Sequence, residues 1–579
     1  MKYNKYIYAV LATAALTASS CKEAFLEEKP YSNYNAAAVS SSTFEAQLIG
    51  LHRNYADLWG WSDRQGFTSA WQIGMDITSA GATEGVETGF YQYGSLNSDN
   101  AAVSWLWTRC YDFINNANII IAAAGDNNKA ANAEARFFRA YAYNILVTLW
   151  GDVPLLTEPV TVPTFNFTRQ KVADIDNIIA EDLTYAITNL PDAGKAVTES
   201  RINKDIARQL AAEAYLRIGM RDNTYFTKSE QMSTDIINNT RYKLIEARYG
   251  KFTGEDGDYY RDMFRFGNQR YSQGNTEAVW TFEMEYDRDV KNGGTIGSPQ
   301  QRRVWQPSYH NWAEMVNADS LGGRGNGRLR LSNFMKYNVW QGLQGDIRNS
   351  NYNIRRTTNY NKPDPIVNGV AEPWSTEIGI DAKGFRVAKD SPSRVKTIFI
   401  KRGDKVIPFE ADSLVTWYPY PTKWGGYDPT DDFGFAVVKD WPAMRLGETY
   451  LLRAEARFRQ NNTGGAADDI NALRARAFKQ ARIDQSNPDL GKVSAANINI
   501  DFILDERARE LIAEENRRMT LVRTGKLKDR IALNGDTGPE GKVTTGFQDY
   551  NVLLPIPLAE IQLNNKQGES LIQNVGYTK

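Results

Sequence analysis

Apolar residues recur with a helical period along roughly the first 240 residues of the chain. In 42–58 they fall near i, i+3 and i+4, and Ser42 or Thr43 can cap the start of the helix. The same period returns in 103–124, 131–150, 172–191 and 203–219. Gly151 ends the third of these segments just before Pro154. Paired helices separated by short breaks favour tetratricopeptide-like hairpins, whose repeat is about 34 residues.

The helical period is lost between about 242 and 441. Gly, Asn, Arg and aromatic residues dominate there, and strand-like alternation is confined to "EAVWTFEME" at 277–285 and "KTIFIKRG" at 396–403. The glycine cluster Gly322–Gly327 lacks the Gly-Lys-Ser/Thr ending of a phosphate-binding loop and indicates an ordinary loop. The carboxylates that follow Glu255 do not have the spacing of a calcium loop, so a solvated loop is the simpler interpretation.

Helices return after Trp441, at 442–462 and 467–477, and a long charged helix is predicted from Asn499 to Gly525. The charges of this last segment could form a paired-carboxylate active site. They alternate in sign at i, i+3 and i+4, however, which favours salt-bridged helix faces. The residues concerned are Glu506, Arg507, Glu510, Glu514, Arg517 and Arg518.

The N-terminus has the pattern of a secretory signal. Lys2 and Lys5 precede the apolar run "YIYAVLATAALTA", which is shorter than the roughly 20 residues of a spanning helix. The following "LTASSC" resembles a bacterial lipobox, although Leu16 lies five residues before Cys21 and Ala18 occupies the usual position. The alternative is a conventional signal peptide with an incidental cysteine. We expect lipidation at Cys21, because this cysteine stands at the end of a signal-like run. Multiple acyl chains would then anchor the protein stably.

Composition narrows the chemistry further. The 579 residues include 42% apolar and 24% charged residues with a net charge of −1, which gives no basis for nucleic-acid binding. Only Cys110 remains beside Cys21, so no disulfide is expected within the mature chain, and Cys110 is interpreted as a small buried hydrophobe. Two histidines favour neither a metal site nor a Ser-His-Asp triad, and we expect no cofactor. The aromatic residues, 14 Trp, 30 Tyr and 24 Phe, are in excess and are the chemically suggestive part of the composition.

Several motifs in one order resemble the SusD/RagB family of outer-membrane nutrient-uptake lipoproteins. The resemblance runs along the chain through "C…FLEEKP" at 21–30, "AEARFFRAYAYNILVTLWGDVPLL" at 133–156, "YPTKW" at 420–424, "RLGETYLLRAEA" at 445–456, "ERAREL" at 506–511, "LPIPLAEIQLN" at 554–564 and "QNVGY" at 573–577. Gly447 stands where Ala is usual, and Arg518 and Thr520 stand where the family often has Trp and Asp.

The resemblance implies a mainly α fold in which tetratricopeptide-like hairpins from both chain ends pack on an irregular, loop-rich middle region. The implied division is a signal peptide at 1–20, an N-terminal helical region at 21–241, a variable ligand-binding region at 242–441 and a C-terminal helical region at 442–579. It also implies a lipid-anchored protein of the outer membrane, facing the cell exterior. Such a protein binds an oligosaccharide, or a peptide in RagB-like members, and delivers it to a TonB-dependent SusC-like transporter.

Ligand contacts are predicted from chemistry, because the matched motifs belong to the scaffold. Apolar faces of sugar rings stack on flat aromatic side chains, and polar groups around them bind the hydroxyls. Two polar, glycine-bearing stretches offer that mixture, and the candidates are Trp71, Tyr91, Tyr93, Arg302, Trp305, Tyr309 and Trp312. For any single ring, core packing is the simpler interpretation, and Tyr143, Trp150 and Tyr450 are expected in the core. The next candidates would be Tyr259, Tyr260, Trp340 and Trp374.

Two other classes of function stay open at this point. A glycoside hydrolase needs two carboxylates that flank the sugar. Among 69 acidic residues such a pair is always available, but no catalytic motif supports one. A structural surface protein would need no aromatic platform. The resemblance favours binding without catalysis, and we expect no enzymatic activity.

Overall fold

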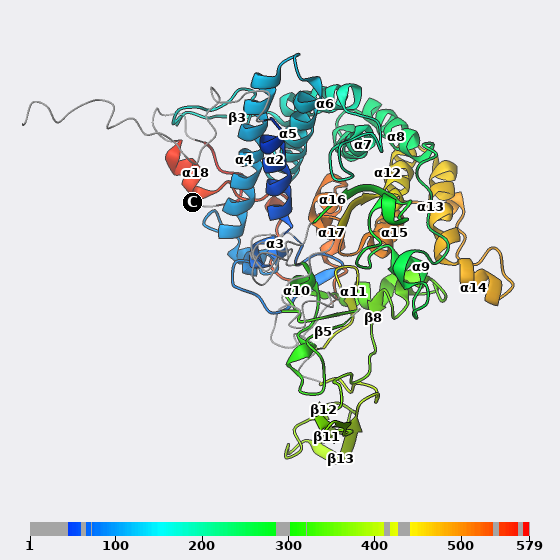
Figure 1. Ribbon diagram of the computed structural model, residues 1–579. Coiled ribbons are helices and arrows are strands. Elements are labelled where there is room, and N and C mark those ends of the chain that lie inside the picture. Colours follow the sequence, from blue (N-terminus) through cyan, green and yellow to red (C-terminus); the bar gives the residue numbers. More distant parts are fainter. Residues whose placement is uncertain are drawn as a thin grey trace, which may run out of the picture.

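The computed structural model describes residues 44–59, 65–70, 72–284, 301–319, 321–409, 417–425, 440–535, 544–564 and 571–577. The signal segment and Cys21 lie outside these residues. Helices dominate, and the strands pair only in small sheets of two or three strands. The predicted mainly α class is therefore confirmed. In Figure 1 the helices form a curved row across one side of the molecule, and a small sheet lies at the opposite end.

The N-terminal helices follow the periodic segments of the sequence. Asn100, Asn128 and Asn203 cap three of them with side-chain oxygens that accept hydrogen bonds from free backbone N–H groups. Successive helices pack against each other, most extensively α4 with α5, α5 with α6, and α7 with α8. The seventh helix, α8, was not predicted. The bounds are α2 Phe44–Leu58, α3 Gln65–Ala70, α4 Ala101–Ala124, α5 Lys129–Trp150, α6 Val172–Asn189, α7 Lys204–Gly219 and α8 Thr224–Ile237.

Short strands and single helical turns make up the middle of the chain. The strands are β1 Thr78–Ala80, β2 Val153–Pro154, β3 Arg169–Gln170, β4 Ala278–Phe282, β5 Ala318–Asp319, β6 Gly322–Gly323, β7 Leu329–Leu331, β8 Ile354–Arg355, β9 Ile366–Val367, β10 Val370–Ala371, β11 Ser375–Asp381, β12 Arg386–Val387, β13 Arg394–Lys401, β14 Tyr420–Pro421 and β15 Trp441–Arg445. The short α-helices are α9 Tyr259–Asp262, α10 Gln301–Trp305 and α11 Asn333–Lys336. Both stretches with strand-like alternation do form strands, β4 and β13.

Pairing is antiparallel in each of these small sheets. In some of them it joins segments far apart in sequence, and in others it joins neighbouring segments. β4 pairs with β15, β1 pairs with β7, and β11 lies between β12 and β13. Single 3₁₀ turns connect the strands, among them η3 Thr88–Phe90, η4 Tyr93–Ser95, η7 Tyr309–Asn311, η8 Asn338–Trp340 and η9 Ile347–Asn349.

The C-terminal helices are α12 Leu446–Arg459, α13 Thr463–Ala477, α14 Lys479–Asp484, α15 Ile500–Leu511, α16 Arg517–Arg523, α17 Leu527–Ile531 and α18 Leu558–Leu563. The single long helix predicted from Asn499 to Gly525 is wrong, because the chain turns between α15 and α16. Ala513 has a φ of 64°, which no continuous right-handed helix contains, and Asn516 caps the new helix by accepting from the Met519 N–H.

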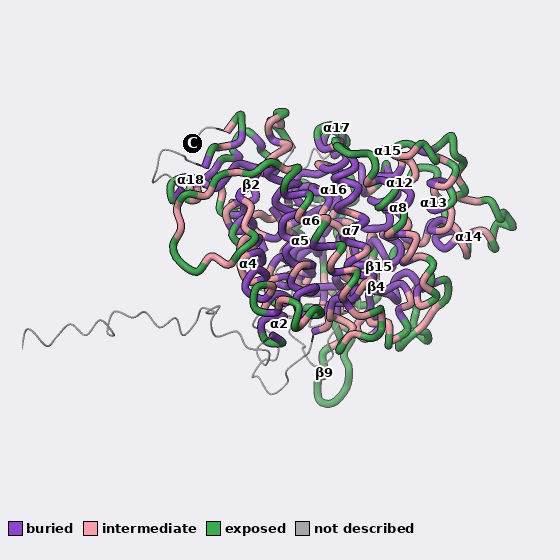
Figure 2. The backbone as a smooth tube through the Cα atoms, turned by 90° about the horizontal axis from the view of Figure 1, so that it is seen from above, coloured by how far each residue is buried: buried purple, intermediate pink, exposed green. Residues whose placement is uncertain are grey.

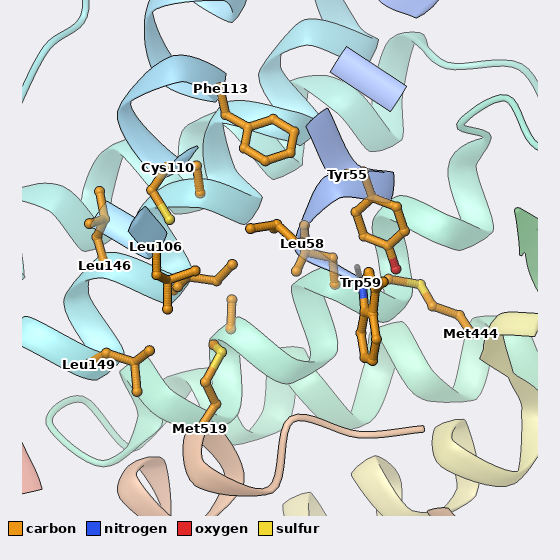
Figure 3. Close-up of a cluster of buried hydrophobic side chains, with 14 of the residues drawn as sticks. Tyr55, Leu58, Trp59, Leu106, Cys110, Phe113, Leu146, Leu149, Met444 and Met519 are labelled. Carbon is orange, nitrogen blue, oxygen red and sulfur yellow. The ribbon is translucent and has the colours of Figure 1, made fainter. Parts of the chain in front are cut away.

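One large hydrophobic core unites all three regions of the sequence. It takes in residues of α2, α4, α5, α7, β4, β15 and α15 to α17, and Figure 2 shows the buried backbone gathered along the row of helices. Figure 3 shows Cys110 packed beside Leu106 and Leu146 in this core. Its thiol is fully buried, and burial raises its pKa, so the interpretation of Cys110 as a small hydrophobe is confirmed.

Arg139 and Asp182 make a buried connection between successive helices. Arg139 on α5 donates from Nε and Nη2 to the two carboxylate oxygens of Asp182 on α6, each at 2.8 Å. Its Nη1 donates to Asn118 Oδ1 on α4 at 2.7 Å. A bidentate arginine–carboxylate pair fixes orientation as well as distance. Arg139 therefore joins three helices.

A larger buried ion network surrounds Glu510 on α15. Its carboxylate accepts from Arg348 at 2.9 Å, from Arg445 at 2.5 Å and from Arg476, all of which are buried. These arginines lie on η9, β15 and α13. The expectation of salt-bridged faces along one helix is therefore wrong for Glu510, because its partners come from distant segments and the group is excluded from solvent.

We predict that Gly151→Val destabilises the protein. Gly151 ends α5 with φ 75° and ψ −128°, a conformation that side chains with a Cβ rarely adopt, and an added Cβ would lie 3.1 Å from Leu553 Cδ1. The free energy of unfolding should fall by about 1–3 kcal/mol, measured by denaturant titration.

Gly464→Ala is the matched control. This glycine lies inside α13 and a Cβ there would meet nothing within 4 Å. Alanine should leave the stability unchanged or raise it by up to about 1 kcal/mol. Equal losses in both variants would contradict a special conformational role for Gly151.

We also predict acid sensitivity from the buried carboxylates. Burial alone would raise the pKa of Glu515, but Arg507 and Arg517 outweigh it and lower the pKa from 4.5 to about 2. Because the folded pKa lies below the unfolded one, this stabilisation is complete above about pH 4.3 and is lost as the pH falls toward 2. The shift corresponds to roughly 3 kcal/mol.

The measurement is the melting temperature of wild type and Glu515→Gln between pH 7 and pH 2.5. The variant should be less stable at neutral pH, and the difference should shrink on acidification below about pH 4. A difference that stays constant with pH would show that Glu515 is not ionised in the folded protein.

Candidate functional site

The two stretches that carry the predicted ligand residues lie side by side. β1 and β7 pair in the register Thr78↔Leu331 and Ala80↔Leu329. Arg328, just before β7, donates to Glu84 Oε1 at 2.6 Å and to Gln65 Oε1 at 3.2 Å. Backbone pairing and these polar contacts therefore bring the loops near 65–100 and 301–331 together, although more than 200 residues separate them in sequence.

Tyr309 and Trp312 belong to a cluster of aromatic rings. Trp312 stacks on Trp417 with the ring centroids 5.9 Å apart and an interplanar angle of 28°, and Tyr309 lies 5.9 Å from the same ring. Tyr309 is 0% exposed and Trp312 8% exposed. These rings pack against one another and against the inner side of the small sheet formed by β11 to β13.

A polar corner borders this ring cluster. The guanidinium of Arg386 lies 4.9 Å from the centroid of Phe409 and 5.9 Å from that of Trp312, and it pairs with Glu314 at 3.0 Å. Its Nη1 also reaches the Tyr360 hydroxyl at 3.5 Å. Burial would lower the pKa of Arg386, but Glu314 raises it above its ordinary value. We call Trp312, Glu314, Tyr360, Arg386 and Phe409 the Arg386 corner.

The Arg386 corner has the chemistry that an oligosaccharide needs. Arg386 and Phe409 are half-buried and reach the surface in part, whereas the Glu314 carboxylate that pairs with Arg386 is buried. A guanidinium beside a carboxylate offers donors and acceptors to adjacent hydroxyl groups. No sequence signal marks this constellation, because Glu314, Arg386 and Phe409 come from separate segments and belong to no motif.

Trp305 and Arg302 lie on α10, which packs on α3 and β7. Trp305 is 2% exposed and its Nε1 donates to Gln301 Oε1 at 3.2 Å, while the Tyr418 hydroxyl donates to its carbonyl at 3.4 Å. Arg302 is 3% exposed. Both residues are therefore in the packed support of the loops.

Tyr91 and Tyr93 lie in a different neighbourhood. The Tyr93 hydroxyl accepts from Arg518 Nη2 at 2.6 Å, and its ring meets Phe547 edge-on at 4.8 Å. Tyr91 and Tyr93 are 4% and 0% exposed. They contact the C-terminal segment. The other predicted rings that the structure describes lie on α10 or in the cluster of Tyr309, Trp312 and Trp417, which forms a second hydrophobic core with the inner side of the β11–β13 sheet. Trp71 lies outside the described residues.

The predicted residues therefore do not form one open platform in the described part of the chain. Their burial does not favour direct stacking on a ligand, and their assignment as ligand contacts stays a prediction. Of the rings expected in the core, Tyr143 and Trp150 are fully buried and Tyr450 is partly buried.

Positive charge gathers around η7. Burial, together with Arg324, Arg303 and Arg302, lowers the pKa of His310 to about 4. The imidazole is therefore neutral at physiological pH. The described residues contain no group of three or more His, Cys, Asp or Glu side chains placed to hold a metal ion.

The fold defines a class of protein in which a scaffold of paired helices carries a loop-rich region. Two family models match the chain: the SusD family model over 416–577, and the model described as starch-binding associating with outer membrane over 24–216. The chain belongs to the SusD/RagB family, as the sequence motifs predicted.

Individual relatives extend this result. The SusD-like protein P25 of Formosa agariphila is 26% identical over 96% of this chain and 97% of its own length. The starch-binding protein SusD of Bacteroides thetaiotaomicron is 34% identical over 28% of this chain and 26% of its own length. The structure of surface glycan-binding protein A from Bacteroides thetaiotaomicron in complex with laminarihexaose has the same fold, with a TM-score of 0.63, 16% identity and coverage of 93% of this chain and all of that one.

Proposed function

We propose that the protein binds an oligosaccharide at the cell surface and delivers it to a TonB-dependent SusC-like transporter of the outer membrane. The similarity to a SusD-like protein over nearly the whole of both chains carries this proposal. One relative whose name states starch binding, and a structure in complex with laminarihexaose, favour a glycan over a peptide. Among the described residues, no helix is long and apolar enough to cross a membrane, and the proposed membrane contact is a lipid on Cys21.

The Arg386 corner is the proposed binding site, and it adjoins the cluster of Tyr309, Trp312 and Trp417. The C–H groups of a sugar ring would contact the edge of Phe409. The hydroxyl groups of the sugar would form hydrogen bonds with Arg386 and Glu314. Trp305, Tyr309 and Trp312 would support these groups from below. The buried rings fix the geometry of the corner, because close-packed side chains keep one arrangement.

The proposed activity is binding without cleavage. A glycoside hydrolase places two carboxyl groups about 5–10 Å apart on either side of the scissile bond. In the Arg386 corner the one carboxylate among its five residues, Glu314, is paired with Arg386 rather than free to donate a proton. This arrangement suits hydrogen bonding to hydroxyls better than acid catalysis.

The first test is isothermal titration of the chain from residue 22 onward with laminarin, xyloglucan and starch oligosaccharides and with a peptide mixture. Phe409→Ala and Arg386→Gln should weaken glycan binding by about tenfold to a hundredfold, if a ring contact is worth about 1–3 kcal/mol. The glycan should be recovered at unchanged length.

Trp150→Ala is the control, because Trp150 is fully buried and its Nε1 donates to the Pro555 carbonyl at 2.8 Å. It should lower the melting temperature without a selective loss of affinity. Trp71→Ala and Trp305→Ala test, in the same assay, the aromatic ligand contacts that were predicted from the sequence. Binding of peptide alone, or shortening of the glycan, would reject the proposal in favour of a RagB-like protein or a hydrolase.

A separate test concerns the anchor. Cys21→Ala should release the protein from the membrane fraction, because its thiol is the proposed site of acylation. Metabolic labelling with a palmitate analogue provides the measurement. Label that persists in the variant would show that the lipid is attached elsewhere.

A further inference from the structure

The sheet of β11, β12 and β13 projects from the end of the molecule opposite the helices (Figure 1). Among the described residues, hydrophobic side chains cover one of its faces. Ile378, Ile380 and Ile400 are 2–3% exposed and pack into the second core, beside Tyr309 and Trp312. Because side chains alternate along a strand, the residues between these isoleucines face outward.

The outward face carries an exposed aromatic ring. Phe399 is 71% exposed and Val395 is 64% exposed. In the register of β11 and β13, Phe399 lies opposite Glu377, Thr397 opposite Gly379, and Lys401 opposite Ser375, so these side chains share one face. The small residues at 375 and 379 leave the flanks of the ring open.

A single exposed apolar residue needs no explanation, but this part of the chain holds several. Of the fifteen large hydrophobic side chains exposed among the described residues, five lie within 366–399. They are Ile366, Val367, Val370, Val395 and Phe399. The projecting part of the molecule therefore differs from the rest of the described surface.

Cations surround the ring. Lys389 Nζ lies 3.4 Å from Glu377 Oε2, which places Lys389 on the outward face. Arg394 Nη1 donates to the Lys389 carbonyl and lies 3.3 Å from Thr397 Oγ1. Lys401 is the third cation of this face, and Glu377 is its exposed carboxylate. Asp381 is buried and accepts from the N–H groups of the β11–β12 turn, and Asp404 accepts from the Lys401 N–H in the turn after β13. The exposed side chains that the strands place on the face therefore carry more positive than negative charge.

From these contacts we propose that this face is a second binding surface, for an anionic polysaccharide that carries carboxylate or sulfate groups. A sugar ring stacks on Phe399, and Lys389, Arg394 and Lys401 bind the anionic groups. Outward side chains follow one another about 7 Å apart along a strand, so the row from Val395 to Lys401 is about 20 Å long. An extended chain of several sugars fits that length.

Charge and shape decide between possible occupants. A second copy of this chain would bring the same three cations against each other, which is unfavourable. An acidic protein would need a complementary pocket for its side chains, and the face of this sheet is an open row. A linear anionic glycan needs only a ring face, hydroxyl partners and cations, all of which are present.

This proposal is independent of oligosaccharide binding at the Arg386 corner. Phe399 points away from the second core, so its removal leaves Trp312 and Arg386 in place. The two sites can therefore be tested separately in one set of variants.

The experiment is titration of the chain from residue 22 onward with polygalacturonate, dextran sulfate and neutral dextran. At least one anionic polymer should bind, neutral dextran should not, and added salt should weaken binding. Phe399→Ala should reduce the affinity about tenfold, and Lys389→Glu combined with Lys401→Glu should abolish binding. The arm that binds identifies the anionic group.

Tyr337→Ala is the matched control, because Tyr337 is an aromatic ring 58% exposed elsewhere on the surface. It should bind like wild type. Absence of binding to both anionic polymers would overturn the proposal. So would equal affinity in Phe399→Ala and Tyr337→Ala, because non-specific attraction of polyanions does not depend on one ring. Loss of neutral-oligosaccharide binding in Phe399→Ala would overturn the separation of the two sites.

Discussion

The buried carboxylate of Glu510 is the interaction on which the rest of the structure depends. It is fully excluded from solvent and neutralised by arginines from three segments, at positions 348, 445 and 476. An isolated buried charge is costly, so the folded state requires all these segments to be in place together. Arg476 and Arg445 also share Glu277, which extends the same requirement to the segment before β4. The C-terminal helices and the irregular middle of the chain are thereby held together.

A second buried charge, that of Asp76, connects the C-terminal helices to the loops around β1 and β7. Asp76 accepts from Arg517 at 2.6 Å and from Arg530 at 2.9 Å, and these arginines outweigh the effect of burial and lower its pKa. Asp76 lies two residues before β1, whose pairing with β7 positions the 301–331 stretch. The position of the loop region therefore follows from ion pairs in the C-terminal helices. The buried rings of these loops, such as Tyr93 and Trp305, add to the same hydrophobic core.

Much of the scaffold could be predicted from local sequence, and little of the site could. Helical periodicity and cap residues located α2 and α4 to α7, because these signals act within a few residues. The break at Ala513 was missed, since an apolar and charged pattern continues across it and only tertiary contacts reverse the chain. The burial of Tyr93 and Tyr309 could not be predicted either. An aromatic residue in a polar, glycine-bearing stretch has the same local sequence whether its ring is exposed to solvent or, like that of Tyr93, contacts Arg518. The Arg386 corner could not be predicted, because Glu314, Arg386 and Phe409 meet only after the small sheet has folded.

The residues that identify the family are those that hold it together. Arg445 begins the motif "RLGETYLLRAEA", Glu510 lies in "ERAREL", and the two are joined by a direct ion pair. Such buried charges tolerate few substitutions, because removing one partner leaves the other uncompensated. Ligand contacts have no such constraint, since an exposed ring or cation can change without unfolding the protein. A sequence in this family therefore indicates its fold through its buried charges. The residues of the Arg386 corner belong to no such motif, and only the folded structure brings them together.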